Sequence, residues 1–255
     1  MTSTRSNIAL VTGAADRVGA ALAKRLAAEG FAVIVHYRAS AENAASVVEA
    51  IEAAGGRAAA VQADLTVRAE RAGLIAAAAQ PFGPLAVLVN NASLFERDSI
   101  ADIDETLWDT HFAIHAEAPV FLARDFAAQL PARTHGNIVN IIDERVLHLS
   151  PAYFSYTLSK ATLWVATQTL AQSLAPRIRV NAIGPGPTLP HIGQTQAQFD
   201  ASTAATPLQH GTTPDEIADA MMFLLGAPAI TGQMLALDGG RHIRWPEKSG
   251  PTPRK

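Results

Sequence analysis

Short apolar runs alternate with longer amphipathic segments along the whole chain. Each run is four to seven residues long and almost continuously apolar, which is typical of strands buried on both faces of a parallel sheet. The runs predict strands at residues 7–11, 31–37, 57–62, 85–89, 137–142, 177–183 and 234–237.

The segments between these runs have helical length, and several carry start or stop signals. Gly30 follows the first, Thr213 is a predicted N-cap, and Pro214 is the expected first residue of the last helix. Pro119 predicts either a kink or a boundary inside the longest segment. The expected helices cover 18–29, 41–54, 67–80, 103–130, a segment containing Tyr156, and 214–225.

Regular alternation of strand and helix requires a parallel sheet with helices on both faces. No internal repeat or linker interrupts the pattern, so we expect one α/β domain over 1–245, Rossmann-like and doubly wound, with about seven strands. Residues 184–213 form the expected substrate loop, and the polar part from 191 predicts a mobile cover. Residues 246–255 read as a solvated tail, whereas 241–245 are candidates for packing.

Composition narrows the possible functions. Apolar residues make up 49% of the chain and charged ones 17%, with a net charge of −3, so no overall field favours nucleic acid or anionic lipid. The absence of Cys excludes disulfides, thiolate nucleophiles and Cys-based metal sites, and no metal site is expected. The polar N-terminus and the lack of a long apolar run predict a soluble, cytoplasmic protein.

Polar residues follow four of the predicted strands, at 12–19, 36–40, 90–95 and 143–160. The carboxyl ends of parallel strands share one edge of the sheet, where α/β proteins bind ligands. In the first segment, Gly13 and Gly19 bracket a turn before a helix, which can hold an anion on backbone N–H groups. Arg17 stands where a middle glycine often does, and an ordinary β–α turn remains the alternative.

The second segment bears on the choice of cofactor. An NAD site carries Asp or Glu about 20 residues beyond the glycine turn, whereas this chain has the sequence HYRAS. Arg binds phosphate through its planar fork, so Arg38, Ser40 and Arg17 favour NADP(H). After the third strand, Asp64 either accepts from an adenine amino group or caps the next helix, a role Thr66 can share.

The last of these segments carries the candidate proton chemistry. Tyr156 and Lys160 are four residues apart on one helix face, and Asp143 leaves the preceding strand. Phe95 can stack on a flat ring or simply anchor a loop. His115 has no second ligand at suitable spacing and is interpreted as a structural residue.

Together these features resemble the short-chain dehydrogenase/reductase family along nearly the full chain. The matching stretches are the 12–19 turn, Asp64, NNA at 90–92, Tyr156-x-x-x-Lys160, Asn181 with its Pro-Gly loop, and LDGG near the end. Three departures are similar to the pteridine reductases and to their dihydromonapterin/dihydrofolate reductase branch. They are Arg17, Asp143 in place of a catalytic Ser, and His115 in place of a catalytic Asn.

The resemblance implies NADPH-dependent reduction of a pterin C=N bond, with Tyr156, Lys160 and Asp143 catalytic and a homotetramer as the assembly. Lys160 is expected to lower the pKa of Tyr156. The implied substrate contacts are Arg17, Ser93, Phe95, Asp143 and Tyr156. The implied cofactor contacts are Gly13, Arg17, Val18, Gly19, His36, Tyr37, Arg38, Ser40, Asp64, Leu65, Asn91, Ala92, Ser93, Tyr156, Lys160, Pro185 and Gly186.

Two alternatives remain open at this point. A carbonyl or 3-oxoacyl reductase of the same family would carry Ser at position 143, where this chain has Asp. A non-catalytic NADP(H)-sensing protein on the same fold would have no need of Tyr156 and Lys160.

Overall fold

The computed structural model describes residues 7–191 and 193–244, and in that part of the chain seven strands form one parallel sheet. The strand order is β3-β2-β1-β4-β5-β6-β7, so the order reverses between β1 and β4. The strands are β1 (Ile8–Val11), β2 (Ala32–Tyr37), β3 (Arg57–Gln62), β4 (Val87–Asn90), β5 (Gly136–Ile141), β6 (Ile178–Pro185) and β7 (Met234–Leu237).

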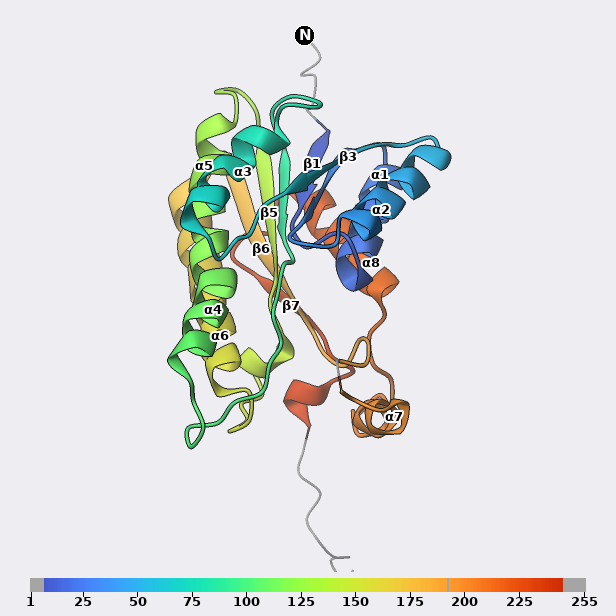
Figure 1. Cartoon of the computed structure of the whole chain (residues 1–255), viewed down its shortest axis with the longest axis vertical. Coiled ribbons are helices and arrows are strands. Elements are labelled where there is room, and N and C mark those ends of the chain that lie inside the picture. The colour runs from blue at the N-terminus through green and yellow to red at the C-terminus, as the bar shows by residue number, and fades with distance from the viewer. Residues whose placement is uncertain (1–6, 192, 245–255) are drawn as a thin grey trace, which may run out of the picture.

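Helices cover both faces of the sheet, as the alternating pattern requires. Figure 1 shows the sheet nearly edge-on, with α3, α4, α5 and α6 on one side and α1, α2 and α8 on the other. The helices are α1 (Arg17–Ala28), α2 (Ala41–Ala53), α3 (Arg68–Ala78), α4 (Glu105–Phe112), α5 (Ala118–Gln129), α6 (Phe154–Leu174), α7 (Gln196–Ala204) and α8 (Pro214–Gly226).

Alternate residues of each central strand pack into two separate hydrophobic cores, one on each face of the sheet. In β1, Ala9 and Val11 pack under α1, α2 and α8, whereas Ile8 and Leu10 pack under α3, α5 and α6. Fully burying a side chain such as Val or Leu stabilises the fold by roughly 1.5–3 kcal/mol. Because both faces of the strand are buried, β1 and β4 read as nearly unbroken apolar runs. Inside β5, Asn140 is buried and hydrogen-bonds to Asn90 and Thr167.

The predicted 103–130 helix is three elements. A π-helical segment, Ala113–Glu117, separates α4 from α5, and Pro119 lies in the first turn of α5. Pro119 has no N–H, and its ring would clash with the carbonyl of His115 in a regular α-helix. The wider π turn accommodates the proline, and it places His115 against the cavity side of the sheet.

Three other expectations change in detail. The 191–213 stretch contains a helix that the sequence did not predict, α7, whose capping box joins Thr195 to Gln198, and its role as a mobile cover stays a prediction. Neither Asp64 nor Thr66 caps α3, which begins at Arg68 without a side-chain cap. Thr213 does cap α8, as predicted.

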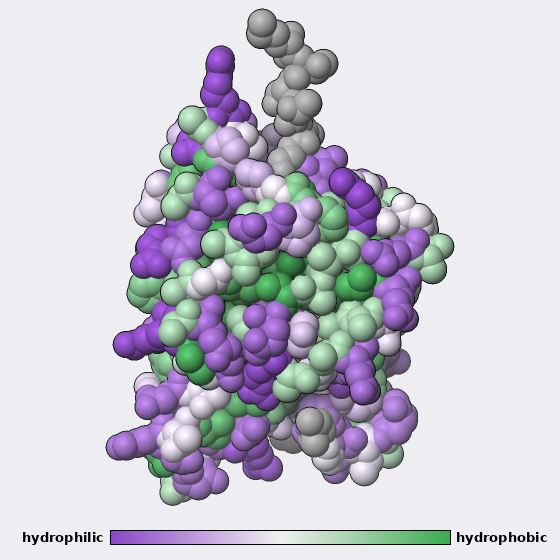
Figure 2. Space-filling model, turned by 45° about the horizontal axis from the view of Figure 1, so that its top comes forward, coloured by the Kyte–Doolittle hydropathy of each residue, from purple (hydrophilic) through white to green (hydrophobic). Residues whose placement is uncertain are grey.

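Of the residues expected to pack at 241–245, Arg241 and His242 are half-buried, whereas Ile243 and Arg244 are exposed. Residues 241–243 form a 3₁₀ turn, and His242 bonds to Asp238. Trp245 and the 246–255 tail lie outside the described residues. Within the described ranges, no helix combines the length and apolar character needed to span a bilayer. Figure 2 shows one face of the molecule that is largely hydrophilic, with hydrophobic residues gathered near its middle.

Candidate active site

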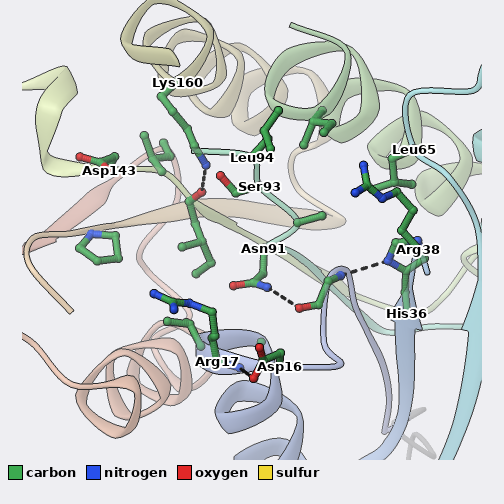
Figure 3. A pocket seen from close by; sticks show the side chains of 18 of the residues that line it. Asp16, Arg17, His36, Arg38, Leu65, Asn91, Ser93, Leu94, Asp143 and Lys160 are labelled. Carbon is green, nitrogen blue, oxygen red and sulfur yellow. Dashed lines mark hydrogen bonds between the residues drawn. The ribbon is translucent and has the colours of Figure 1, made fainter. Parts of the chain in front are cut away.

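A cavity of about 450 Å³ lies at the carboxyl edge of the sheet, where the strand order reverses. Figure 3 shows side chains converging on it from the first turn, from β2 and β4, and from the β5–α6 connection. Tyr37 and Ser40 are not among its lining residues, so their predicted contacts stay predictions. The predicted residues that line it are Gly13, Arg17, Val18, Gly19, His36, Arg38, Asp64, Leu65, Asn91, Ala92, Ser93, Asp143, Tyr156, Lys160, Pro185 and Gly186.

The glycine turn is locked to the end of β4. Thr12 Oγ1 accepts the N–H groups of Asn91 and Ala92, and Asn91 Nδ2 donates to the carbonyls of Thr12 and Gly13. Gly13 has φ +62°, and a Cβ there would lie 2.9 Å from Ala92 Cα. Gly19 packs against the same turn. Both positions require glycine because backbone from two strand ends meets here.

Arg17 connects this turn to the segment that follows β6. It has φ +51°, in the left-handed region where a glycine commonly stands. Its Nη2 donates to the carbonyl of Pro190 over 3.0 Å and to that of Leu189 over 3.4 Å. The guanidinium therefore lies between the nucleotide-binding turn and the loop that follows β6.

His36 is a buried neutral support for the turn. Its Nδ1 accepts the N–H of Gly13 over 3.0 Å, so its Nε2 carries the proton and donates to the carbonyl of Ala63 over 3.0 Å. Burial lowers the pKa of His36 from 6.5 to about 4. Protonating Nδ1 would remove the acceptor that holds Gly13 in place.

The walls beside the turn come from the ends of β2 and β3. Arg38 is exposed and lines the cavity. Asp64 Oδ1 accepts both the N–H and the hydroxyl of Thr66, which fixes the carboxylate at the cavity wall. Although partial burial opposes it, the bonds from Thr66 and the charge of Arg38 lower the pKa of Asp64.

The predicted proton-transfer group is assembled at the other end of the cavity. The Tyr156 hydroxyl donates to Asp143 Oδ2 over 2.8 Å, and Asp143 Oδ1 accepts the N–H of Arg145. Lys160 is 2% exposed, and its Nζ donates to the carbonyl of Ile141 over 2.9 Å. Figure 3 shows Lys160 and Asp143 approaching the same end of the cavity.

The acid–base balance of this group differs from the sequence-based expectation. Burial raises the pKa of Tyr156 well above 10, and the adjacent Asp143 carboxylate raises it further. Burial also lowers the pKa of Lys160 to about 8, against the opposing effect of Asp143. The ammonium lies 5.7 Å from the centre of the Tyr156 ring and bonds to a backbone carbonyl. The prediction that Lys160 would lower the tyrosine pKa is therefore wrong for this arrangement, since burial and Asp143 dominate.

A second cavity of about 330 Å³ continues from the first, sharing Arg17, Val18, Asp143, Gly186 and Thr188 with it. Aromatic rings form one side of it.

Phe95 stacks on Tyr153 with ring centroids 4.3 Å apart and meets the edge of Tyr156 at 4.8 Å. The Arg145 guanidinium lies over both Phe95 and Tyr153. One face of Phe95 is thus already covered by protein.

Sequence reasoning missed several residues of this second cavity. Glu144 is 2% exposed, and burial next to Asp143 raises its pKa to about 7. Glu144 pairs with Arg241 at 3.5 Å, which brings the C-terminal 3₁₀ turn against the site. The only available signal was position, because Glu144 and Arg145 directly follow Asp143. Contacts between segments nearly a hundred residues apart have no local signature.

Several hydrophobic residues of the first cavity were also not predicted. Leu94, Ile114, Ile141 and Ile142 contribute apolar walls between the polar strand ends. Among residues 7–191 and 193–244, no three His, Cys, Asp or Glu side chains are grouped to hold a metal ion.

A seven-stranded parallel sheet with this order, a glycine turn at the switch point, and a Tyr–Lys pair beside it define a nucleotide-dependent oxidoreductase of short-chain type. A family model described as enoyl-(acyl carrier protein) reductase matches residues 13–242. The chain belongs to the short-chain dehydrogenase/reductase family.

Similar structures and sequences refine this assignment. The FolM alternative dihydrofolate reductase 1 of Brucella canis, solved with NADP, is 45% identical, has a TM-score of 0.93, and the match covers 97% of this chain and 99% of that one. The corresponding Brucella suis protein, also with NADP, is 45% identical with a TM-score of 0.91 and 99% coverage of both chains. An uncharacterized oxidoreductase of Methylorubrum extorquens is 38% identical over 248 residues, covering 94% of this chain and 99% of that protein.

The packing of the glycine turn predicts opposite effects for two Gly→Ala changes. In Gly19→Ala, the new Cβ would overlap Gly13 O and lie 2.6 Å from Asn91 Nδ2, so we expect a loss of about 1–3 kcal/mol in the free energy of unfolding. Gly73→Ala, at an exposed position of α3, has no atom within 4 Å of its Cβ and should gain up to about 1 kcal/mol in the free energy of unfolding. Urea denaturation measures both, and a shared direction would contradict the packing argument.

The buried neutral His36 predicts a pH-dependent stability. Below pH 6.5 His36 becomes protonated in the unfolded chain, whereas in the folded chain it is protonated only near pH 4. The contribution of neutral His36 to the free energy of unfolding is therefore complete above pH 6.5. It is lost as pH falls toward 4, by about 3 kcal/mol in total. His36→Gln should flatten that part of the stability–pH curve, measured by denaturation. His135→Gln, at an exposed position, is the control. Identical curves for wild type and His36→Gln would rule the effect out.

Proposed function

We propose that this protein is an NADPH-dependent reductase that transfers hydride to a C=N bond of a pterin, such as a dihydropterin, dihydromonapterin or dihydrofolate. The observation that carries the proposal is the 2.8 Å hydrogen bond from the Tyr156 hydroxyl to the Asp143 carboxylate. The similarity to FolM alternative dihydrofolate reductases at 45% identity supports the same substrate class.

The first cavity has the side chains that a dinucleotide phosphate needs. The turn between Gly13 and Gly19 presents backbone to the cavity, and Arg38 is exposed beside it. A guanidinium suits a 2′-phosphate, and no carboxylate follows β2 to repel one. Asp64 supplies an ordered acceptor for an amino group. Bound there, NADPH would supply the hydride; the protein supplies orientation and the proton.

The reduction adds hydride to the carbon of the C=N bond and one proton to its nitrogen. Tyr156 is protonated at neutral pH, and its proton points at Asp143. Burial and Asp143 raise the Tyr156 pKa, so release of the proton depends on the charge of Lys160 and on the basicity that the ring nitrogen gains. Proton transfer can therefore run from Tyr156 through Asp143 to the ring nitrogen, which gains basicity as hydride arrives. Lys160 holds its charge close to the pair and compensates the negative charge left behind. A positioned acid of this kind typically contributes about 10²–10⁴-fold to the rate.

A carboxylate at position 143 favours a pterin over a carbonyl substrate. Reduction of a carbonyl builds negative charge on oxygen, which an adjacent carboxylate would repel. A C=N nitrogen is more basic than a carbonyl oxygen, so it takes its proton more readily as hydride arrives, and the N–H group that results can donate to the carboxylate. Phe95 lines the second cavity and is placed to contact a flat ring, and Arg17 reaches both cavities.

The remaining parts of the proposal concern the loop and the assembly. Residues 184–213 are proposed as the substrate loop, held at its start by the bonds from Arg17 to Leu189 and Pro190. Homotetramer formation is proposed by analogy with the family. Exposed apolar side chains on α5 and α6, including Phe121, Leu158 and Val165, are suitable for contacts between subunits.

Substitutions in the proton-transfer pair test the reaction. Tyr156→Phe removes the donor and should lower kcat with a dihydropterin by about 10²–10⁴-fold. Asp143→Ser should also lower pterin turnover strongly, by about 10² or more. Asp219→Ser changes an exposed residue on α8 and serves as the control. Activity of Tyr156→Phe within a few-fold of wild type would reject the donor, and a wild type that reduces only ketones would reject the substrate class.

Cofactor choice is tested by fluorescence titration with NADPH and NADH. The wild type should bind NADPH more tightly, by about tenfold or more, since a charge-assisted phosphate contact contributes about 1.5–3 kcal/mol. Arg38→Ala should abolish most of that difference, whereas Arg57→Ala, at an exposed position on β3, should leave it unchanged. Equal affinities of the wild type for the two nucleotides would refute the role given to Arg38.

A further inference from the structure

His115 lies between two serines beneath the floor of the first cavity. It is 1% exposed and belongs to the π-helical segment that precedes Pro119. Its Nε2 is 2.9 Å from Ser93 Oγ, and its Nδ1 is 2.8 Å from Ser159 Oγ. His115 does not itself line the cavity, whereas Ser93 does. Of the cavity-lining residues, Ser93 is the one whose side chain hydrogen-bonds directly to His115.

The surrounding hydrogen bonds determine which ring nitrogen carries the proton. The N–H of Leu94 points at Nε2 over 3.3 Å, and an N–H cannot bond to another N–H, so Nε2 must be an acceptor. Ser159 has one hydroxyl proton, which it donates to the carbonyl of Tyr156 over 2.7 Å. Nδ1 must then donate to Ser159. Two independent contacts thus assign the proton to Nδ1.

The charge state of His115 is equally constrained. Burial holds its pKa well below 6.5, and the neighbouring Lys160 ammonium and His111 ring lower it further. His111 packs against it with ring centroids 5.5 Å apart, and the Tyr156 ring meets its edge at 5.2 Å. No carboxylate contributes to its pKa shift, so the ring stays neutral at physiological pH.

A neutral ring with an unprotonated Nε2 fixes the direction of the Ser93 hydroxyl. Ser93 has a single proton, and donation to Nε2 uses it. The lone pairs of Ser93 Oγ remain. The same side chain also contacts the Tyr156 side chain, whose pKa it lowers against the larger effect of burial, and it is exposed to the cavity near Lys160 (Figure 3). A free serine can donate or accept as a substrate requires. Ser93 can only accept.

We propose that His115 is a positioning residue that makes the Ser93 hydroxyl a permanent hydrogen-bond acceptor, so that the cavity selects substrates presenting an N–H group at this point rather than a carbonyl oxygen. The assignment of the proton stands on the protein contacts alone, whereas the selection of the substrate rests on the proposed function. A pterin ring carries amino and ring N–H donors, and a simple ketone carries none. A carbonyl oxygen opposite Ser93 would face lone pairs with no intervening proton, which leaves both groups unpaired.

The tautomer is measurable without substrate or cofactor. Long-range ¹H–¹⁵N correlation of ¹⁵N-histidine-labelled protein distinguishes the two nitrogens of each of the 8 histidines. The signal missing from His115→Asn identifies His115. We expect a neutral ring protonated on Nδ1 and unchanged from about pH 5 to about pH 9. An Nε2-protonated ring, or an imidazolium in that range, would overturn the proposal even if pterin reduction is demonstrated.

A double-mutant cycle tests the route through Ser93. Ser93→Ala should lower kcat/KM for a dihydropterin by about 10–100-fold, because a buried substrate donor loses its partner. His115→Phe should cost about tenfold in the wild-type background and less than about threefold in Ser93→Ala, since its target is then absent. A purely structural role would instead give equal losses in both backgrounds.

Substrate analogues separate this inference from the proposed function. Ser93→Ala should have less than about a threefold effect on a pterin analogue that lacks the N–H donors, compared with its larger effect on the parent compound. Equal effects on both compounds would refute selection by acceptance, even with normal pterin turnover. Absence of turnover with every pterin would reject the substrate half together with the proposed function, while the NMR result still decides the tautomer. If His115→Phe does not fold, Ser93→Ala and the wild-type spectrum suffice.

Discussion

Burial of the sheet on both faces is the constraint on which the rest of this protein depends. Side chains of β1 alternate between two helical layers, so the interior of the strand has no room for polar groups. Most polar side chains around the site therefore follow the strand ends, and parallel strands bring those ends to one edge. The site is thus a consequence of the architecture before any particular residue is considered. Reversal of the strand order at β1 and β4 opens the crevice that the polar ends surround.

Within that crevice, low dielectric sets the chemistry of each titratable group. His36 and His115 are neutral because charging them would cost the desolvation of a buried ring. Each neutral ring accepts one backbone N–H, and each thereby fixes a neighbour: the glycine turn for His36, the Ser93 hydroxyl for His115. Tyr156 and Lys160 are shifted in the same sense, toward their uncharged forms. The carboxylate of Asp143 is the remaining polar counterpart, and it takes the tyrosine proton as a hydrogen bond.

Segments distant in sequence complete the second cavity. Arg17 reaches the loop after β6, and Arg241 reaches Glu144 from the C-terminal 3₁₀ turn. These contacts join the first turn to the segment after β6, and the 3₁₀ turn at 241–243 to the β5–α6 connection. The segment after β6 forms part of the wall of the second cavity, and α7 lies within that segment.

The sequence by itself determined the fold class, the order of strands and helices, and the candidate Tyr156–Lys160–Asp143 group. Those properties follow from local periodicity, and α6 holds Tyr156 and Lys160 at a fixed spacing. The sequence did not predict three local features: the π turn before Pro119, the missing cap of α3, and the helix inside the 191–213 stretch. Each depends on competition between similar local conformations. Only the tertiary structure decided the direction of the Tyr156 pKa, the stacking of Phe95 on Tyr153, and the tautomer of His115. Desolvation and hydrogen-bond direction depend on every atom around a group, and most of those atoms come from segments far away in the chain.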